Sequence, residues 1–267
     1  MQEGGIRLAI RHELISEERP VISVITVVYN GERHLAQAIE SVAGQNCSGL
    51  EYIIIDGGST DRTIEIIRKY EKNIDYWRSE VDLGISDAFN KGVACSKGKY
   101  IAFLGSDDWY EPGVIAPLMK ELKSEKTIYS GSMNLISHPD GRLLKVHMSR
   151  PDRLLQTMRI SHPASFTPRN LINESGGFST SYTIAMDYDM MLKAWIAGYD
   201  FMTFSTVITN HRRGGVSRDL MTVFKEELII KNTLLGKHMT HFVWYLANVV
   251  YFKARRFCDI FSKGKVK

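Results

Sequence analysis

The stretch VISVITVVYNGERHLAQAIESVAGQNCSGLEYIIID, residues 21–56, predicts a strand, a helix and a second strand. Its two ends, VISVITVV and LEYIII, are short and rich in β-branched residues, as buried strands are. The segment between them has helical character over about 32–45. The same alternation continues in strand-like runs at 74–79 and 99–104 and in helix-like segments at 61–72 and 85–95. This pattern predicts an α/β fold in which helices cover both faces of a mostly parallel sheet.

The composition is that of a globular protein, with 44% hydrophobic and 24% charged residues. The three cysteines form no CxxC motif or Cys/His cluster, which argues against a zinc site and favours a reducing cytosol. The first residues lack the apolar core of a signal peptide. No stretch reaches the roughly 18 uncharged apolar residues of a membrane span. We therefore expect a cytoplasmic protein.

Basic residues are concentrated at the end of the chain. From Leu220 onward there are nine Lys/Arg and three Asp/Glu, whereas the rest of the chain has 25 and 27. Such a charge asymmetry is informative about binding partners rather than about the fold. No nucleic-acid-binding motif accompanies these residues, so nucleic acid is not an expected partner.

The segment HFVWYLANVVYFKARRF, residues 241–257, lies in this basic region. As a helix it would present a broad apolar face made of Phe242, Tyr245, Leu246, Val249, Val250 and Phe252. This pattern predicts a helix lying in the plane of an anionic membrane, on the cytoplasmic face of the inner membrane. The alternative is that the helix packs on the catalytic domain or on a second subunit, which leaves a homo-oligomer open.

Polar residues follow three of the predicted strands, at 29–31, 56–59 and 105–108. Each cluster alone is compatible with an ordinary turn or a helix cap. Because the carboxyl ends of parallel strands share one edge of a sheet, the three clusters are expected to converge on a binding crevice.

The crevice is predicted to bind a nucleoside diphosphate. Neither a GxGxxG after the first strand nor a GxxxxGK[ST] is present, which argues against dinucleotide and P-loop sites. The pair Asp107 and Asp108 would repel a diphosphate unless Mn²⁺ or Mg²⁺ stood between them. Asp56 has the chemistry to accept a hydrogen bond from a base N–H, and Tyr29 to stack on that base.

Four segments in one order resemble family 2 glycosyltransferases of the GT-A fold: VISVITVVYNGERHLAQAIESVAGQ, EYIIIDGGSTDRT, SEVDLGISDAFNKGVACSKGKYIAFLGSDD and GGFSTSYTIAMDYDMMLKAW. The similarity extends over about residues 20–217 and is greatest to bacterial members that build surface polysaccharides. It implies a Rossmann-like sheet and a metal-dependent, inverting hexosyl- or N-acetylhexosaminyltransferase. The implied donor is a nucleotide sugar, UDP-linked, and the implied acceptor is a glycan or polyprenyl-linked glycan. The alternative is a catalytically silent nucleotide-sugar-binding or assembly protein on the same fold.

The resemblance also assigns the donor side of the site. It implies that Val27, Tyr29 and Asp56 hold the uridine. It implies that Asp107 contacts the ribose and that Asp108 binds the metal ion.

The resemblance places the catalytic base at Asp187, where Met186 replaces the glutamate that usually precedes it. Asp189 is then structural, although both aspartates would also suit the first turn of a helix. Asp87 is a candidate nucleotide contact or, equally, a helix cap.

A basic loop follows near the end of the matching region. His211 is a candidate further ligand of the metal ion, and Arg212 or Arg213 a candidate contact of the diphosphate. The alternative for His211 is a surface or hydrogen-bonded structural role.

These assignments divide the chain into three parts. We expect an N-terminal extension at 1–19, a GT-A catalytic domain at 20–217 and a helical basic extension at 218–267. Within the catalytic domain, about 20–125 would bind the nucleotide and about 126–217 the acceptor.

Overall fold

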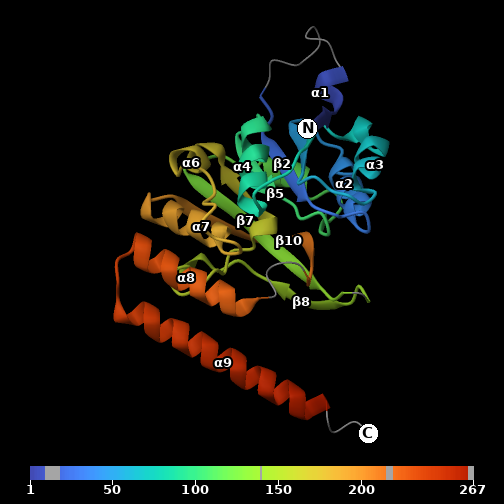
Figure 1. The fold of residues 1–267 in the computed structure, drawn as a ribbon. Coiled ribbons are helices and arrows are strands. Elements are labelled where there is room, and N and C mark those ends of the chain that lie inside the picture. Colours follow the sequence, from blue (N-terminus) through green and yellow to red (C-terminus); the bar gives the residue numbers. More distant parts are fainter. Residues whose placement is uncertain (10–18, 139, 215–218, 264–267) are drawn as a thin grey trace.

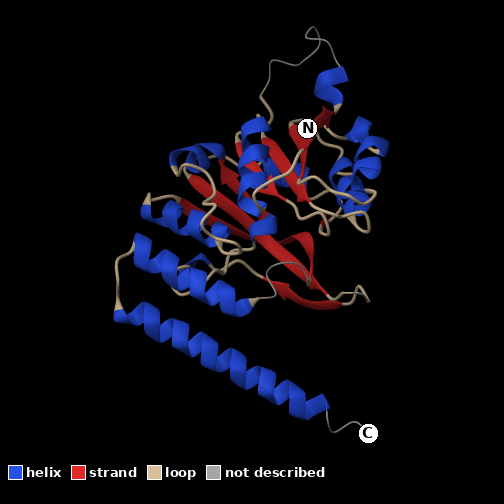
Figure 2. Ribbon diagram, viewed as in Figure 1, coloured by secondary structure: helices blue, strands red, loops and turns tan. Residues whose placement is uncertain are grey.

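The computed structural model describes residues 1–9, 19–138, 140–214 and 219–263. Within this part of the chain, ten strands form one sheet (Figure 2). The strands are β1 (Gln2–Gly4), β2 (Ile22–Val28), β3 (Leu50–Asp56), β4 (Tyr76–Ser79), β5 (Tyr100–Phe103), β6 (Trp109–Tyr110), β7 (Thr127–Ile136), β8 (Leu143–His147), β9 (Ser165–Pro168) and β10 (Asp200–Arg212). Their order is β1-β4-β3-β2-β5-β9-β7-β10-β6, with β8 paired to β7.

Helices connect and cover these strands (Figure 1). The α-helices are α1 (Ile6–Ala9), α2 (Leu35–Ala43), α3 (Thr63–Lys69), α4 (Ile85–Cys95), α5 (Ile115–Met119), α6 (Arg169–Glu174), α7 (Met186–Ile196), α8 (Leu220–Leu234) and α9 (Met239–Lys263). Short 3₁₀ turns are η1 (Glu71–Asn73), η2 (Pro151–Arg153) and η3 (His162–Ala164).

The predicted mostly parallel α/β sheet is confirmed. Strands β4, β3, β2 and β5 are neighbours and all parallel. Each of the four runs predicted as a strand is one. The helices predicted over 32–45 and 61–72 are shorter, because polar turns occupy the residues before Leu35 and Thr63.

The sheet is covered on both faces because successive side chains of a strand point to opposite sides. Val24 of β2 belongs to a core that includes Leu35 and Ile39 of α2. Its neighbour Ile25 belongs to a second core with Val93 of α4 and the buried face of α7. Helix α4 approaches very closely at Gly92, where a Cβ atom would lie 2.4 Å from Ile25 Cγ2.

The second half of the sheet is mixed. β9 is antiparallel to both β5 and β7, and it joins the two halves. The long β10 runs parallel to β7, and its end pairs with the short β6 through Asn210 and Trp109. This pairing brings residues after β5 beside residues at the end of β10.

The start of the chain differs from the expected division, whereas its end is helical as predicted. Part of the predicted N-terminal extension belongs to the sheet, because β1 pairs with β4 and α1 follows it. At the other end, Figure 1 shows α7, α8 and α9 one below the other, and α8 contacts both of its neighbours. The predicted boundary between 217 and 218 lies outside the described residues. In the described part of the chain, no helix is long and apolar enough to cross a membrane.

Candidate active site

The three polar strand ends meet, as predicted from the parallel topology. The Asn30 amide donates to Ser59 Oγ at 2.7 Å, and the Thr60 amide donates to Asn30 Oδ1 at 2.9 Å. A Cβ atom added at Gly31 would lie 3.5 Å from Ser106 Oγ. The residues after β2, β3 and β5 therefore form one edge of the molecule.

Asp56 holds the loop after β3 in place at this edge. Its carboxylate is fully buried and accepts hydrogen bonds from the Gly58 and Ser59 amides and from the Ser59 and Ser79 hydroxyls. The loop after β3 is thus folded around this carboxylate. A contact of Asp56 with a nucleotide stays a prediction.

The two other residues predicted to hold uridine lie at the end of β2. Val27 is half-buried against the core on the α4 side. Tyr29 follows the strand and is 65% exposed. Its ring is open to solvent, as a stacking surface for a base needs to be.

Asp108 and His211 lie side by side although 103 residues separate them. The Asp108 carboxylate is buried, with Oδ2 2.9 Å from His211 Nδ1, and its Oδ1 accepts the Arg212 amide at 3.0 Å. The adjacent β6–β10 pairing explains this contact. The structure therefore brings together the two residues predicted to bind a metal ion.

The charges at this position influence one another. Burial lowers the pKa of His211, but the hydrogen bond and charge of Asp108 outweigh burial and raise it above the ordinary value. Burial and the Asp108 carboxylate raise the pKa of Asp107. The raised pKa of His211 favours an ion pair with Asp108, so a metal ion bound here would displace the imidazole proton.

Arg212 is tied to the protein. Its guanidinium donates to the Asp107 carbonyl at 2.5 Å and to Gln37 Oε1 at 2.8 Å, and lies 4.6 Å from the centre of the Trp109 ring. These contacts hold β10 against the loop after β5. A contact of Arg212 with a diphosphate stays a prediction.

The donor set of Asp108 and His211 fits Mn²⁺ or Mg²⁺. The two ligand atoms are a carboxylate oxygen and an imidazole nitrogen, and Mn²⁺ accepts both types. Mg²⁺ commonly binds through one or two carboxylates, with phosphates and water as its other ligands. Among the described residues, no group of three or more His, Cys, Asp or Glu is placed to hold a metal ion. Binding of a metal ion by Asp108 and His211 stays a prediction.

Asp187, the predicted base, is in the first turn of α7 and half-buried. Burial raises its pKa to about 6, and the Tyr188 amide donates to its Oδ1 at 2.8 Å. Asp189 is buried instead and forms an ion pair with Lys193 at 2.7 Å. The two aspartates thus differ in environment in the way that a base and a structural residue would.

Glu226, which contacts the loop leading to Asp187, was not among the site residues predicted from the sequence. Its carboxylate, on α8, accepts hydrogen bonds from the amides of Thr183, Ile184 and Ala185 and from the Thr183 hydroxyl. The available signal was that Glu226 is one of only three acidic residues from Leu220 onward.

Asp87 has local contacts at the start of a helix. It is in the first turn of α4, accepts the Leu83 amide at 3.0 Å and pairs with Lys91 at 3.0 Å. The Leu83 hydrogen bond is the main cause that lowers its pKa. Asp87 thus ties the residue before the N-cap Gly84 to the first turn of α4, and a nucleotide contact of Asp87 stays a prediction.

An aromatic cluster connects the end of β5 to the turn before α7. The His162 ring stacks on Phe103 at 5.3 Å, and Phe178 packs edge-on against Phe103 at 5.1 Å. Burial lowers the pKa of His162 to about 4, so its ring is neutral at pH 7. Asn90 of α4 fixes the turn by hydrogen bonds to both backbone groups of Phe178.

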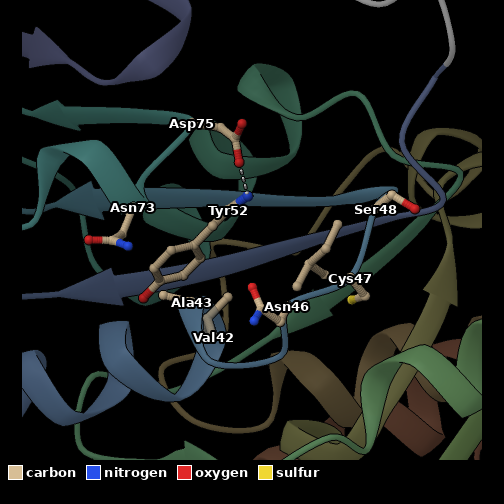
Figure 3. Close-up of a pocket in the computed structure, with 9 residues that line it drawn as sticks. Val42, Ala43, Asn46, Cys47, Ser48, Tyr52, Asn73 and Asp75 are labelled. Atoms are coloured by element: carbon tan, nitrogen blue, oxygen red, sulfur yellow. Dashed lines mark hydrogen bonds between the residues drawn. The ribbon is translucent and has the colours of Figure 1, made fainter.

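A cavity of about 390 Å³ lies elsewhere (Figure 3). It is lined by residues around the start of β3 and before β4, among them Asn46, Cys47, Tyr52, Asn73 and Asp75. The Tyr52 amide donates to Asp75 Oδ2 at 2.7 Å. These strands begin there and end at the polar edge, so the cavity is at the opposite end of the sheet from the candidate site.

Comparisons with known proteins agree on one family. The profile of Glycosyl transferase family 2 matches residues 23–191. The chain is 30% identical over 230 residues to a chondroitin synthase of Pasteurella multocida (strain Pm70), across 82% of this chain and 23% of that protein. It is 33% identical over 183 residues to a hyaluronan synthase of Pasteurella multocida, across 65% of this chain and 18% of that protein. The chain thus spans about a quarter or less of the length of these curated relatives.

A solved structure has the same fold. TarS residues 1–349 from S. aureus, in complex with UDP-GlcNAc, matches with a TM-score of 0.63 at 18% identity, over 83% of this chain and 69% of that chain. The profile match covers more than half of the present chain and includes both the polar strand ends and the first turn of α7. The chain belongs to glycosyl transferase family 2.

Proposed function

We propose that this protein is an inverting glycosyltransferase that moves a hexosyl or N-acetylhexosaminyl group from a UDP-sugar to a hydroxyl group of a glycan or lipid-linked glycan. The observation that carries the proposal is the site itself. The buried Asp108 and the half-buried His211 lie side by side at the polar end of the parallel strands, and a carboxyl group with a raised pKa is in the first turn of α7. The similarity to a chondroitin synthase and a hyaluronan synthase supports a role in polysaccharide synthesis.

On the donor side, Asp108 and His211 would hold Mn²⁺ or Mg²⁺. Such an ion, when bound, neutralises the charge that develops on the diphosphate as it leaves. Tyr29 would stack on the base, and Asp56 would hold the neighbouring loop after β3 in place. Asp107, beside the metal ligand, would contact the ribose.

On the acceptor side, Asp187 would remove the proton of the attacking hydroxyl group. A pKa near 6 leaves this carboxyl ionised at pH 7 yet basic enough to accept a proton. The new bond joins the acceptor oxygen to the anomeric carbon, the bond from that carbon to the phosphate oxygen breaks, and UDP departs. A single displacement from the opposite face inverts the anomeric carbon and needs no covalent enzyme intermediate.

Turnover of the donor tests this proposal without knowledge of the acceptor, because water can replace the hydroxyl group. We expect slow release of UDP from at least one member of a panel of UDP-sugars with Mn²⁺ present, and faster release than from the matching GDP- and dTDP-sugars. Binding of a UDP-sugar without any release would support the silent binding protein instead.

We also propose that α9 lies on the cytoplasmic face of an anionic membrane and brings the site to a lipid-linked acceptor. Phe242, Leu246 and Val250 are exposed at successive turns of this helix, with Leu246 44% and Val250 65% exposed. The predicted apolar face is divided, however, since Phe252 packs 6.5 Å from Phe224 of α8. The outer part remains for the membrane, and Lys253, Arg255 and Arg256, whose side chains lie outside the described residues, follow it in the sequence.

Flotation with vesicles tests the membrane proposal. The full-length protein is expected to float with phosphatidylglycerol vesicles and to be released at high salt. Leu246→Glu should abolish flotation, because a carboxylate would enter the apolar boundary. Ile229→Glu is the matched control, since this α8 residue is 48% exposed and receives the same change. If the wild type does not float and Leu246→Glu instead dissociates a dimer, the outer face of α9 is a subunit interface.

A further inference from the structure

Glu226 makes an unusually complete set of contacts for a residue outside the family match at 23–191. One carboxylate oxygen accepts from the Thr183 amide at 2.8 Å and the Thr183 hydroxyl at 2.7 Å. The other accepts from the Ile184 amide at 3.0 Å and the Ala185 amide at 2.9 Å. These amides directly precede α7, so a side chain of α8 closes the N-terminal end of the helix that begins with Met186 and Asp187.

The next residue, Glu227, binds a second segment of the chain. Glu227 is buried and accepts from the Thr157 hydroxyl at 2.8 Å and the Met158 amide at 2.9 Å. Lys231, one turn later, donates to the Gln156 carbonyl at 2.6 Å. α8 is therefore attached to the catalytic domain through buried charged groups, at a cost that hydrophobic packing alone would avoid. This suggests a role beyond covering apolar surface.

We propose that Glu226 is a positioning residue for the base: its carboxylate fixes the 183–185 loop and thereby the place of the Asp187 side chain. The inference rests on the proposed function, because it gives Asp187 the task of proton removal. The first turn of a helix has no intrahelical partners for its amides, so a loop entering α7 without Glu226 would be free to shift. A displacement of about 1 Å at a reacting group lowers a rate by about 100-fold.

Because charged groups surround Asp187, the proposed role of Glu226 can be tested through the pKa of the Asp187 carboxyl. Glu226 adds to burial in raising the pKa of Asp187, and Glu227 also interacts with this carboxyl. Lys231 offsets the charge of Glu227, and Lys193 pairs with Asp189 on the same helix. Removing the charge of Glu226 alone should therefore lower the pKa of Asp187.

The test uses the full-length protein, with UDP-N-acetylglucosamine and UDP-glucose as probes in the presence of Mn²⁺. For Glu226→Gln we expect kcat of donor hydrolysis to fall by about 100-fold with the KM of the donor unchanged. The acidic limb of the pH profile should move to lower pH. A ¹³C titration of the Asp187 carboxyl, assigned with Asp187→Asn, should show the same shift without any donor.

Asp219→Ala is the control for a purely structural effect. Asp219 caps the start of α8 by accepting the Thr222 amide and does not contact the 183–185 loop. This variant should lower the melting temperature and leave both the pH profile and the Asp187 titration in place. The inference is overturned if Glu226→Gln leaves the Asp187 titration unchanged, or if its losses match those of Asp219→Ala. Full turnover in Asp187→Asn would instead contradict the proposed function.

Discussion

Asp187→Asn is expected to abolish turnover while leaving the donor site intact. A general base contributes about 100- to 10,000-fold to a rate, and an amide cannot accept the proton of the acceptor hydroxyl. We therefore expect kcat to fall by about 1,000-fold with the donor KM and the affinity for UDP within twofold of the wild type. Steady-state UDP release and calorimetry with UDP measure the two quantities separately.

The same substitution should not destabilise the protein at neutral pH. Burial raises the pKa of Asp187 to about 6, above the ordinary value of 3.8, so the folded state binds more protons than the unfolded state between these values. Stability from this group is present at low pH and falls as the pH rises from about 4 to 6. Asparagine removes this loss, and the melting temperature at pH 7 should equal or exceed that of the wild type.

Asp189→Asn is the matched control for the base. It breaks the ion pair with Lys193 in a buried place, so it should lower the melting temperature and keep most of the activity. The reverse pattern, with an inactive Asp189→Asn and an active Asp187→Asn, would move the base to Asp189.

Asp108→Asn is expected to remove the metal dependence of donor binding. Wild-type protein should bind UDP with Mn²⁺ and lose most of this affinity in EDTA. Losing even a residue that only supports a metal ligand lowers metal affinity by about 10- to 100-fold, so for a proposed ligand we expect a loss of affinity on the order of 100-fold in Mn²⁺. Its affinity should then match that of the wild type in EDTA, which calorimetry checks directly. Equal wild-type affinity in Mn²⁺ and in EDTA would contradict a metal site at Asp108 and His211.

The sheet could be predicted because each of its central strands is marked by a short run of residues in the sequence. β-branched runs such as 21–28 and 50–55 mark buried strands, and parallel pairing places their ends at one edge without further knowledge. β1 was missed because Gln2–Gly4 is short and polar and acquires its strand conformation only by pairing with β4.

The site was predictable to the extent that a family pattern names its residues. The pattern implied Asp108 as a metal ligand and left His211 as a candidate, and only the β6–β10 pairing explains why the two meet. Glu226 could not be found in this way. Its partners are backbone amides, which have no residue identity, so the sequence at 183–185 carries no sign of the contact.

The attachment of α8 has a consequence for exchanging domains between family 2 glycosyltransferases. A chimera cut at residue 191, where the family match ends, would leave the Thr183–Ala185 amides and the Gln156 carbonyl without the side chains that bind them. The transplantable module of this protein therefore ends after Leu234, and a fusion joint belongs in the short connection between α8 and α9.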